Sequence, residues 1–478
     1  MKEIHSSQIS LISDKPHEEC GVFGIFDPNA DHDVAHITYS ALYALQHRGQ
    51  SSAGIAVNND GKLFAHRDSG LANEVFNEMV LTYLQGSYAL GHVRYSAAGD
   101  EGRENAQPFV CKYNKGQIAV AYNGAIENSA ALRNELEENG AMFHSNSDAE
   151  LIAYIVARER FSHETTDRAL ASAMDKINGA YSMVFLSSNK MIAVRDPNGF
   201  RPLCIGKLGD CWIFASESCA IDAVGGKFVR DVLPGEIVVV SNKGLTSYTD
   251  KCTKKSSLCI FEHIYFARPD SIIDGQSVHF SRVEAGKCLA RRHPVDADIV
   301  FGVPDSGLDA ALGYSRESGI PYAMGLMKNR YIGRTFIQTK QSEREGLVKL
   351  KLNPISAVLR DKRVVVVDDS IVRGTTTANL VRMIREAGAK EVHVRISSPP
   401  FLNPCYFGTD ISSRDKLIAR RMTIEEIGKS IDADTIGYLA IEDLHSIVPN
   451  STVGFCDGCF TGNYPIRIEA EEKLKENK

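Results

Sequence analysis

Several features that would restrict function are missing from this 478-residue sequence. No apolar run approaches the length of about 20 residues that spans a bilayer. The first nineteen residues lack the apolar core of a secretory signal and contain acidic residues, which transit peptides avoid. A formal net charge of −6 gives no electrostatic reason to expect nucleic acid or an anionic membrane as a partner. These absences predict a cytoplasmic protein.

Internal repeats and low-complexity tracts are also absent, and the composition, 43% hydrophobic and 24% charged, is ordinary for a globular chain. The length predicts two or three domains. Eleven cysteines are scattered along the chain rather than densely spaced in a short one. This pattern argues against a disulfide scaffold and favours catalytic or metal-binding thiols.

Residues 20 to 250 are divided by turn signals between short strand-like runs, and these signals predict antiparallel hairpins. The turns are Asn59-Asp60-Gly61, Ser188-Asn189-Lys190 and Gly209-Asp210. Helical patterns occupy 34 to 45, 127 to 140 and the segment from 147. We therefore expect an α+β domain with helices packed on antiparallel sheets.

Residues 296 to 440 follow a different order of strand, loop and helix. DIVFGVP precedes SGLDAALGYSRESG, and VVVVDDS precedes TTANLVRMIREAG, after which VHVRISSPP supplies another strand. The apolar positions Leu380, Val381, Ile384 and Ala387 share one face of the second helix, which Gly388 ends. These βαβ units predict a parallel sheet with right-handed crossovers, and the junction with the first half is expected near 251 to 257.

The most informative stretch is VVVVDDSIVRGTTT, residues 364 to 377. Its β-branched run predicts a strand buried on both faces, ending at Asp368 and Asp369. Ligands bind beyond the carboxyl ends of such strands, where the following loop and helix offer hydroxyls and N–H groups to a phosphate monoester. Phospho-acceptor domains and nucleotide hydrolases also carry acidic pairs there, so the two aspartates alone leave the ligand open.

The whole pattern resembles the phosphoribosyl pyrophosphate (PRPP) motif of type I phosphoribosyltransferases. The resemblance implies that the acidic pair handles the ribose hydroxyls or Mg²⁺ and that the loop wraps the 5-phosphate. The residues that it assigns to PRPP in this stretch are Asp368, Asp369, Ser370, Arg373, Gly374, Thr375 and Thr376.

Cys20 opens the strand-like segment CGVFGIF. A lone cysteine there is more often a small buried hydrophobic residue. Four segments follow, however: LQHRGQ at 45 to 50, GHVRYSAAG at 91 to 99, YNG at 122 to 124 and SNSDAE at 145 to 150. Their order and content resemble the class II, N-terminal-nucleophile glutamine amidotransferases, which implies an αββα sandwich for this glutaminase domain.

In that family the cysteine becomes the mature N-terminus, and its own α-amino group, with a pKa of about 7.7 to 8.0, serves as the base. Removal of residues 1 to 19 is then a requirement. The resemblance implies a bidentate Arg94 on the glutamine α-carboxylate and Asp148 on its α-ammonium. The remaining assignments are Asn123 and the Gly124 N–H as the oxyanion hole and Arg48 and Gly49 as the lining of the nucleophile. One departure is Ala125-Ile126, where relatives often have Asn-Leu.

A glutaminase and a PRPP loop in one chain resemble the amidophosphoribosyltransferase family from Cys20 to about Pro465. The implied reaction gives 5-phosphoribosylamine, glutamate and pyrophosphate, the first step of de novo purine synthesis. The family also implies purine nucleotide inhibitors and a homotetramer. Further residues assigned by this resemblance are Asp305 and Ser306 in a pyrophosphate loop, Ser306 with Asp368 and Asp369 near Mg²⁺, and Lys328, Arg330 and Arg334 in a lid at 328 to 337.

Cys456 and Cys459 form a C-x₂-C pair, which cannot close a tetrahedral metal site alone. Cys259 and Cys405 match the iron–sulfur branch of the same family. Four thiolates suit Zn²⁺ or a [4Fe–4S] cluster, and the spacing does not separate the two. The resemblance favours a structural [4Fe–4S] cluster.

We therefore expect a pro-segment at 1–19, a glutaminase domain at 20–255, an α/β phosphoribosyltransferase domain at 256–445 and a C-terminal segment with cluster ligands at 446–478. Two other functions fit parts of this pattern. A PRPP-sensing regulator predicts a basic DNA-binding module, and none is visible. An amidotransferase with another acceptor, such as a sugar phosphate, does not explain residues 364 to 377.

Overall fold

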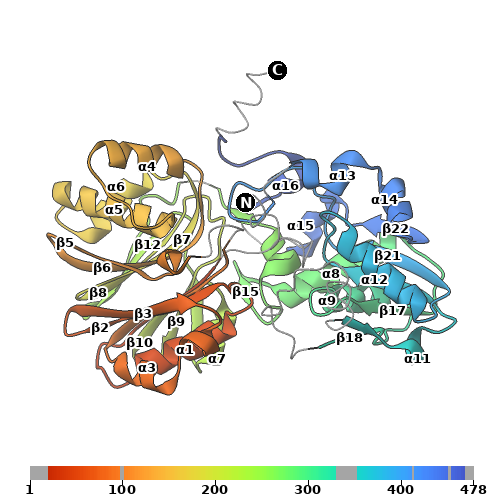
Figure 1. The fold of residues 1–478 in the computed structure, drawn as a ribbon, viewed down its shortest axis with the longest axis horizontal. Helices are drawn as coiled ribbons and strands as arrows, with labels where there is room; N and C mark the ends of the chain where they lie inside the picture. Colours follow the sequence, from red (N-terminus) through yellow and green to blue (C-terminus); the bar gives the residue numbers. More distant parts are fainter. Residues whose placement is uncertain are drawn as a thin grey trace, which may run out of the picture.

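The computed structural model describes residues 20–96, 102–253, 255–329, 352–411, 414–449 and 454–468. The expected pro-segment, together with Arg330, Arg334 and most of the expected lid, lies outside the described residues. Figure 1 shows two lobes, the first coloured red to yellow-green and the second green to blue. The change in sequence pattern near residue 250 therefore coincides with a change of architecture.

The first lobe contains two antiparallel sheets. The seven-stranded sheet has the order β11-β9-β10-β1-β4-β2-β3, and the six-stranded sheet has the order β13-β12-β8-β7-β6-β5. The first comprises β1 (Gly21–Phe26), β2 (Ser52–Asn59), β3 (Lys62–Ser69), β4 (Tyr88–Arg94), β9 (Cys204–Leu208), β10 (Cys211–Ala215) and β11 (Lys227–Asp231). The second comprises β5 (Phe109–Tyr113), β6 (Gly116–Ile126), β7 (Gly179–Ser187), β8 (Lys190–Arg195), β12 (Ile237–Ser241) and β13 (Gly244–Tyr248).

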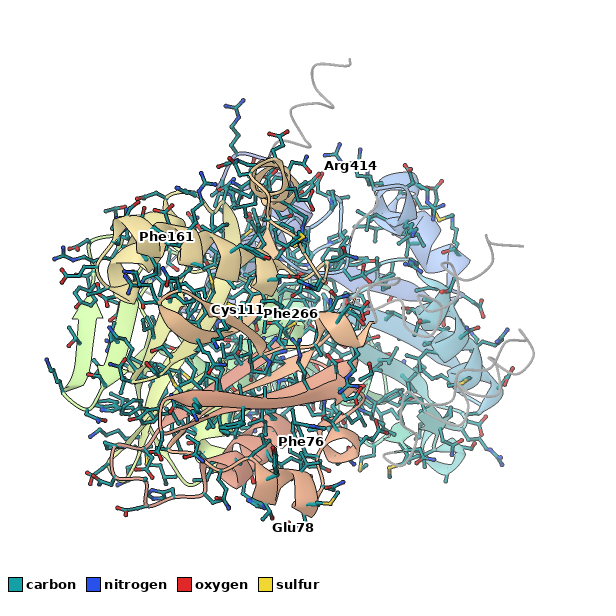
Figure 2. The ribbon with its side chains drawn as sticks, turned by 60° about the vertical axis from the view of Figure 1, so that its left-hand side comes forward. Phe76, Glu78, Cys111, Phe161, Phe266 and Arg414 are labelled. Atoms are coloured by element: carbon teal, nitrogen blue, oxygen red, sulfur yellow. The ribbon has the colours of Figure 1, made fainter. Side chains whose placement is uncertain are left out.

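Helices cover the outer face of each sheet. The seven-stranded sheet packs on α1 (Val34–Ala44), α2 (Ala72–Val75), α3 (Glu78–Tyr83) and α7 (Ser218–Ala223), and the six-stranded sheet on α4 (Ser129–Glu138), α5 (Asp148–Ser162) and α6 (Thr166–Met174). Figure 2 shows Phe161 and Glu78 on opposite outer sides of the lobe. The αββα sandwich is confirmed.

Strand alternation explains the layers. Val22 and Phe26 of β1 point into the core between the two sheets, whereas Phe23 and Ile25 point into the core beneath the helices. Successive side chains of a strand face opposite sides, so one apolar strand supplies both cores. The three expected hairpins are confirmed as β2–β3, β7–β8 and β9–β10, and the three expected helices as α1, α4 and α5.

The second lobe is built on a four-stranded sheet of order β17-β20-β21-β22, in which every pair is parallel. Its main elements are β17 (Ile299–Gly302), α9 (Leu308–Ser318), β20 (Arg363–Asp368), α12 (Thr375–Glu386), β21 (Glu391–Ile396), α14 (Ile424–Ser430) and β22 (Thr435–Tyr438). Val365 and Val367 face one apolar core while Val364 and Val366 face another. The prediction of a strand buried on both faces is confirmed.

The long helix α8 and several short elements complete the second lobe and connect it to the first. They are β14 (Ser257–Cys259), the π-helical turn Glu262–Phe266, β15 (Ile272–Ile273), β16 (Gln276–Ser277), α8 (Val278–Arg292), β18 (Leu326–Lys328), β19 (Leu352–Pro354), α11 (Ser356–Leu359), α13 (Ile418–Arg421), α15 (Leu444–Ile447), β23 (Gly454–Cys456) and α16 (Gly458–Thr461). β14 pairs in parallel with β23. The end of the described chain therefore lies beside the segment that joins the lobes.

Candidate active sites and cysteine cluster

Cys20 directly precedes β1 and is 6% exposed. Gly21 pairs with Val93 in the antiparallel register of β1 and β4, so one further step places position 20 opposite Arg94. Arg94 ends β4 and is also buried. The strand register therefore places the backbone of Cys20 at the end of β4 that carries Arg94.

Gly49 lies against the backbone of Arg94. A Cβ atom at position 49 would lie 2.6 Å from both the N and C atoms of Arg94. Real Cβ atoms do not approach backbone this closely, so only glycine allows the 48–49 segment to pack here. The sequence assigned Gly49 to the lining of the nucleophile, and the described structure gives it this contact with the strand end beside Cys20.

Asn123 and Gly124 lie in β6 of the other sheet. Asn123 is fully buried, and neither polar atom of its amide has a hydrogen-bond partner. An unpaired buried amide costs about 1–3 kcal/mol, and a ligand that pairs with it would remove this cost. Gly124 has a φ of 143°, and a Cβ there would lie 2.0 Å from the Ala180 oxygen. This conformation requires glycine at the position expected to supply the second oxyanion donor.

Asp148 is the first residue of α5, whose N-cap is Ser147. Its Oδ2 accepts from the Tyr122 hydroxyl and from the Ile126 N–H, each at 3.3 Å. Both donors belong to β6, on either side of Asn123 and Gly124. The helix start therefore holds the carboxylate expected to bind an α-ammonium next to the unpaired amide.

His92 is a residue whose role the sequence interpretation missed. It is fully buried on β4, and its Nε2 lies 2.9 Å from the Tyr122 oxygen in the facing sheet. Burial lowers its pKa to about 3, so the ring is neutral at physiological pH. The available signal was strand alternation, because His92 and Arg94 are two residues apart and share one face. His92 joins the sheets next to Asn123.

The Arg48 guanidinium pairs with two buried carboxylates. Its Nε donates to Glu217 Oε1, and its Nη2 donates to Glu262 Oε2 at 2.7 Å. The side chains of all three residues are inaccessible to solvent. Glu262 lies in the turn that begins the second lobe, and Arg201 donates to its other oxygen at 3.4 Å. Arg48 therefore links the nucleophile's surroundings to the second lobe.

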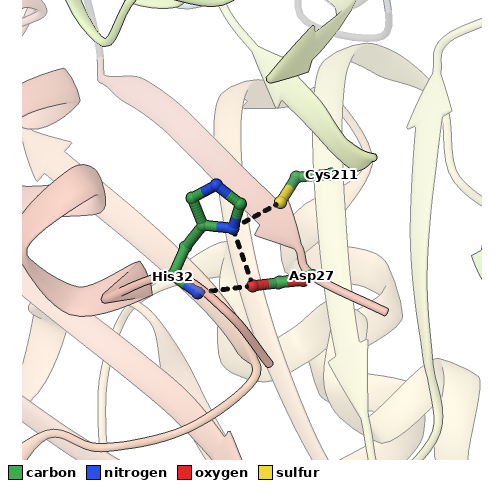
Figure 3. A group of neighbouring side chains, drawn as sticks. All are labelled: Asp27, His32 and Cys211. Atoms are coloured by element: carbon green, nitrogen blue, oxygen red, sulfur yellow. Dashed lines mark hydrogen bonds and ion pairs between the residues drawn. The ribbon is translucent and has the colours of Figure 1, made fainter. Parts of the chain in front are cut away.

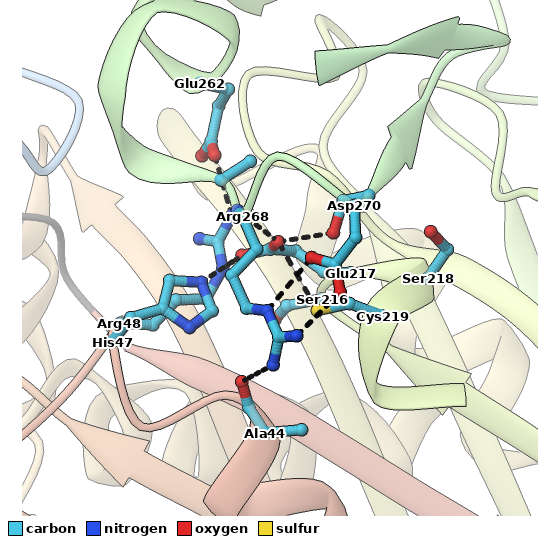
Figure 4. A network of polar contacts seen from close by, with 12 residues as sticks. Ala44, His47, Arg48, Ser216, Glu217, Ser218, Cys219, Glu262, Arg268 and Asp270 are labelled. Atoms are coloured by element: carbon cyan, nitrogen blue, oxygen red, sulfur yellow. Dashed lines mark hydrogen bonds and ion pairs between the residues drawn. The ribbon is translucent and has the colours of Figure 1, made fainter. Parts of the chain in front are cut away.

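Figure 4 shows the polar network around Glu217. Its carboxylate lies 2.6 Å from His47 Nε2 and accepts from the Arg268 N–H at 2.9 Å and the Ser271 hydroxyl at 2.6 Å. Burial favours a raised pKa for Glu217, but Arg48 and His47 hold its pKa well below the ordinary value. Glu217 and Glu262 were not predicted, because no local pattern marks a carboxylate whose partners are distant in sequence.

The acidic loop of the second lobe lies at the carboxyl ends of β17 and β20. The two strands pair in parallel with Gly302 opposite Val367, which brings the loops that follow them together. Ser306 donates its hydroxyl to Asp369 Oδ1 at 2.5 Å, and Ser370 donates to Asp369 Oδ2 at 2.5 Å. The expected proximity of Ser306 to the acidic pair is therefore seen as a hydrogen bond to Asp369.

The phosphate loop ends at the first turn of α12. Gly374 is the N-cap residue and has a φ of 88°, and the cap has no side-chain hydrogen bond. The N-terminus of a 12-residue helix carries partial positive charge and unsatisfied N–H groups, which favour an anion. Thr375 and Thr376 begin this helix, and Arg373 precedes the cap. Across the loops, Lys328 Nζ pairs with Asp305 Oδ2.

The four cysteines predicted to bind a cluster line one cavity, together with aromatic residues that include Phe200, Phe261 and Phe407. Cys259 stands opposite Cys456 in the β14–β23 pair. The Cys459 oxygen accepts from the Leu402 and Asn403 N–H groups, each at 3.0 Å, which holds the segment leading to Cys405. Three separate parts of the chain therefore bring four thiols to one place.

These thiols influence one another electrostatically. Burial raises the pKa of Cys259 to about 12, and burial followed by the neighbouring cysteines raises the pKa of Cys459 well above its ordinary value. No three of the four sulfur atoms, all of which belong to described residues, lie within 4.8 Å of one another. Sulfurs around a tetrahedral Zn²⁺ with bonds of about 2.3 Å are about 3.8 Å apart. The four thiols are therefore not already arranged at the spacing of a single zinc site.

The fold and these sites define a two-domain enzyme class: an N-terminal-nucleophile glutamine amidotransferase joined to a phosphoribosyltransferase. Comparison with protein families agrees. Residues 92–223 match the family described as a glutamine amidotransferase domain, and residues 287–397 match the phosphoribosyl transferase domain. Among the described residues, no helix has the length and apolar character needed to cross a membrane.

Curated relatives match along nearly the whole chain. The amidophosphoribosyltransferase of Archaeoglobus fulgidus is 48% identical over 95% of this chain and 99% of its own length, and that of Bacillus subtilis is 45% identical over 97% of each. The B. subtilis glutamine PRPP amidotransferase, solved as a complex with ADP and GMP, superposes with a TM-score of 0.88 at 45% identity. The match covers 94% of this chain and 98% of that one.

The chain belongs to the amidophosphoribosyltransferase family. It is an enzyme of purine biosynthesis that uses glutamine to aminate PRPP. The glutaminase lobe and the phosphoribosyl lobe described above carry the two halves of this activity.

Proposed function

We propose that Cys20 is the nucleophile of glutamine hydrolysis once residues 1–19 have been removed. The observation that carries this proposal is the unpaired, fully buried amide of Asn123 beside the strand end that holds Cys20 and Arg94. A polar group left unpaired at this place suits an oxyanion that exists only during the reaction. The Gly124 N–H is the second donor.

The reaction at this site proceeds in two stages. The α-amino group of Cys20 takes the thiol proton, and the sulfur bonds to the glutamine amide carbon while Asn123 and Gly124 stabilise the oxyanion. The C–N bond breaks, the amino group returns the proton, and ammonia leaves. Water then cleaves the thioester to give glutamate. Arg94 holds the α-carboxylate, Asp148 holds the α-ammonium, and Arg48 and Gly49 position the segment behind the nucleophile.

Ammonia then attacks C1 of PRPP, and pyrophosphate leaves with the electrons of the C1–O bond. Asp368 and Asp369 hold the ribose hydroxyls, and the loop residues Ser370, Arg373, Gly374, Thr375 and Thr376 hold the 5-phosphate. Asp305, Ser306 and Lys328 face the pyrophosphate, with Arg330 and Arg334 assigned the same role. Ser306, Asp368 and Asp369 would hold Mg²⁺, which would supply countercharge to the leaving group; the oxygen-rich donor set fits this ion.

We also propose a [4Fe–4S] cluster on Cys259, Cys405, Cys456 and Cys459. The four thiols around one cavity support it. When bound, the cluster would supply a structural cross-link. Its ligands join the segment between the lobes to the end of the described chain, through the β14–β23 pair.

The proposal also covers regulation, assembly, location and domain bounds. ADP and GMP are bound in the B. subtilis structure, which supports purine nucleotides as inhibitors of this chain. A homotetramer, a cytoplasmic location, and domains at 20–255 and 256–445 with a C-terminal segment at 446–478 complete the proposal.

Two variants test the assignment of the two sites. Cys20→Ala should lose glutamine-dependent phosphoribosylamine synthesis by about 10⁴-fold or more, as loss of a nucleophile does elsewhere, and retain synthesis from added ammonia. Asp369→Asn should lose synthesis from both sources and retain glutamine hydrolysis. Cys252→Ala, which changes a thiol outside both sites, is the matched control. Glutamine use by Cys20→Ala would show that another residue is the nucleophile.

A further inference from the structure

Three side chains outside both active sites and the cysteine cluster converge on one point (Figure 3). His32 Nδ1 lies 3.0 Å from Asp27 Oδ2 and 3.4 Å from Cys211 Sγ. The three atoms all lie within 4.8 Å of one another, which no other combination of His, Cys, Asp and Glu atoms achieves among the described residues. An imidazole nitrogen, a carboxylate oxygen and a thiol sulfur therefore share a small volume.

The backbone brings these residues together and holds them. Phe26 pairs with Trp212 in the antiparallel register of β1 and β10, so the next step places position 27 opposite Cys211. Asp27 Oδ1 accepts from the Asn29 N–H at 3.0 Å, and Oδ2 accepts from the His32 N–H at 2.8 Å. These two bonds fold the loop before α1 back over the strand ends. The donor set is preorganised by the fold.

The geometry differs from that of a catalytic triad. In a nucleophile–histidine–carboxylate triad, the nucleophile and the carboxylate occupy different ring nitrogens. Here the sulfur and the carboxylate oxygen both face Nδ1. A single cation placed among the three atoms makes this arrangement favourable, because it binds all three lone pairs at once.

We propose that Asp27 Oδ2, His32 Nδ1 and Cys211 Sγ bind a divalent cation of the Zn²⁺ class, with water as the fourth ligand. Tetrahedral bonds of about 2.0–2.3 Å place the ligand nitrogen about 3.6 Å from the sulfur and about 3.4 Å from the oxygen. The two distances observed from the His32 nitrogen, 3.4 Å to the sulfur and 3.0 Å to the oxygen, differ from these values by only about 0.2–0.4 Å.

Burial and charge agree with a metal site. Asp27 and Cys211 are 1% and 0% exposed, whereas the His32 side chain is 37% exposed and leaves a route from solvent. Asp31 and Asp210 flank His32 and Cys211 in the sequence and add negative charge beside Asp27. This negative surrounding favours a dication. The ion would tie the end of β1, the strand that follows Cys20, to β10 and to the start of α1.

Zinc binding to the full-length protein, with its cysteine cluster intact, tests the proposal. Equilibrium dialysis against Zn²⁺ followed by metal analysis compares wild type with His32→Gln and Cys211→Ser. His36→Gln and Cys252→Ser are matched controls, because His36 also pairs with a carboxylate, Asp33, but contacts no thiol. We expect wild type and both controls to bind one zinc ion more than the two test variants at low zinc. The zinc affinity of this site should fall by about 100-fold or more in the test variants. Loss of a residue that only hydrogen-bonds to a metal ligand already costs about 10- to 100-fold.

Metal taken up at the four-cysteine cluster is common to all five proteins and cancels in the comparison. Cobalt substitution adds a second readout: a thiolate-to-metal absorption band that Cys211→Ser removes. If Cys211→Ser does not fold, the exposed His32→Gln variant decides alone, because zinc should raise the melting temperature of wild type and not of this variant. Equal zinc affinity in wild type and His32→Gln would overturn the proposal and leave a hydrogen-bonded cluster only.

Discussion

The two candidate sites are built differently. The glutaminase site lies at the ends of, or inside, buried strands of two packed antiparallel sheets, with Cys20, Arg94 and Asn123. The phosphoribosyl site lies in loops and helix starts that follow parallel strands, with Ser306, Asp369 and Thr375. In the first lobe, strand register decides which side chains meet. In the second lobe, the sheet decides only where the loops meet, and hydroxyl–carboxylate bonds set the rest. The glutaminase site should therefore be the more rigid and the less tolerant of substitution.

A change in the buried network around Glu217 should give the largest loss of stability in this comparison. Glu217 pairs with Arg48, which lies in the segment beside Cys20 and Arg94. Glu217→Gln removes the charge that pairs with Arg48 and His47. Breaking a buried ion pair by removing one partner costs about 3–5 kcal/mol. We expect the free energy of unfolding of the glutaminase lobe to fall by this amount, as measured by denaturant titration.

A matched control uses an exposed pair in the same lobe. Glu135→Gln removes the partner of Arg158, where both side chains are about half exposed, and should cost less than about 1 kcal/mol. If the two variants lose the same stability, the buried network contributes no more than an exposed ion pair. The glutaminase site would then not be more rigid than the loop-built site on this ground.

Asn123→Ala tests the rigid site directly. Loss of one oxyanion donor costs about 2.7–4 kcal/mol of transition-state stabilisation, or about 10²–10³ in kcat. We expect this loss in glutamine hydrolysis, with ammonia-dependent synthesis unchanged. The control is Asn128→Ala, whose amide donates to the Lys176 oxygen at the surface. A variant that lost both activities equally would indicate a structural role for Asn123.

The local parts of both lobes could be predicted from the sequence. Turn chemistry located the hairpins, apolar periodicity located α1, α4, α5 and α12, and the β-branched run located a strand that is buried on both faces. Each of these signals lies within about ten to fifteen residues of chain, where backbone preference and side-chain alternation act together.

The partners of buried charges could not be predicted. Arg48 was expected to line the nucleophile, but its guanidinium pairs with Glu217 and Glu262, which are 169 and 214 residues away. His92 was within a recognised motif, yet nothing local indicated that its ring would reach Tyr122 in the other sheet. Alternation gives the face of a strand and says nothing about what packs against that face.

The buried ring of His92 adds a pH dependence to the rigid site. Burial lowers its pKa to about 3, against an ordinary value of 6.5. Below pH 6.5 the unfolded chain binds a proton that the folded chain excludes until about pH 3, so stability is complete above 6.5 and falls as the pH falls between these values. At pH 5 the loss from this group is about 2 kcal/mol.

Denaturant unfolding of wild type and His92→Gln at pH 7 and pH 5 measures the loss of stability that is due to His92. The loss of stability between the two pH values should be about 2 kcal/mol smaller in the variant. His144→Gln, which replaces a ring that is 81% exposed, should behave as wild type. Identical pH dependence in wild type and His92→Gln would mean that the buried ring accepts a proton without cost.

Lys328 gives the smallest expected effect, because its ion pair lies at the exposed edge of the loop-built site, whose Asp368 and Asp369 are buried. The Lys328–Asp305 pair is 33% and 63% exposed, so its loss should not affect folding. Lys328→Met keeps the length of the side chain and removes the charge proposed to face pyrophosphate. We expect KM for PRPP to rise by about tenfold, or about 1.4 kcal/mol, with glutamine hydrolysis in the absence of PRPP unchanged.

Lys390→Met, on the chain between α12 and β21, is the control for loss of a positive charge. A fall in kcat without a change in KM would mean that the charge acts on the transition state alone, and the loop-built site would then be as preorganised as the glutaminase site.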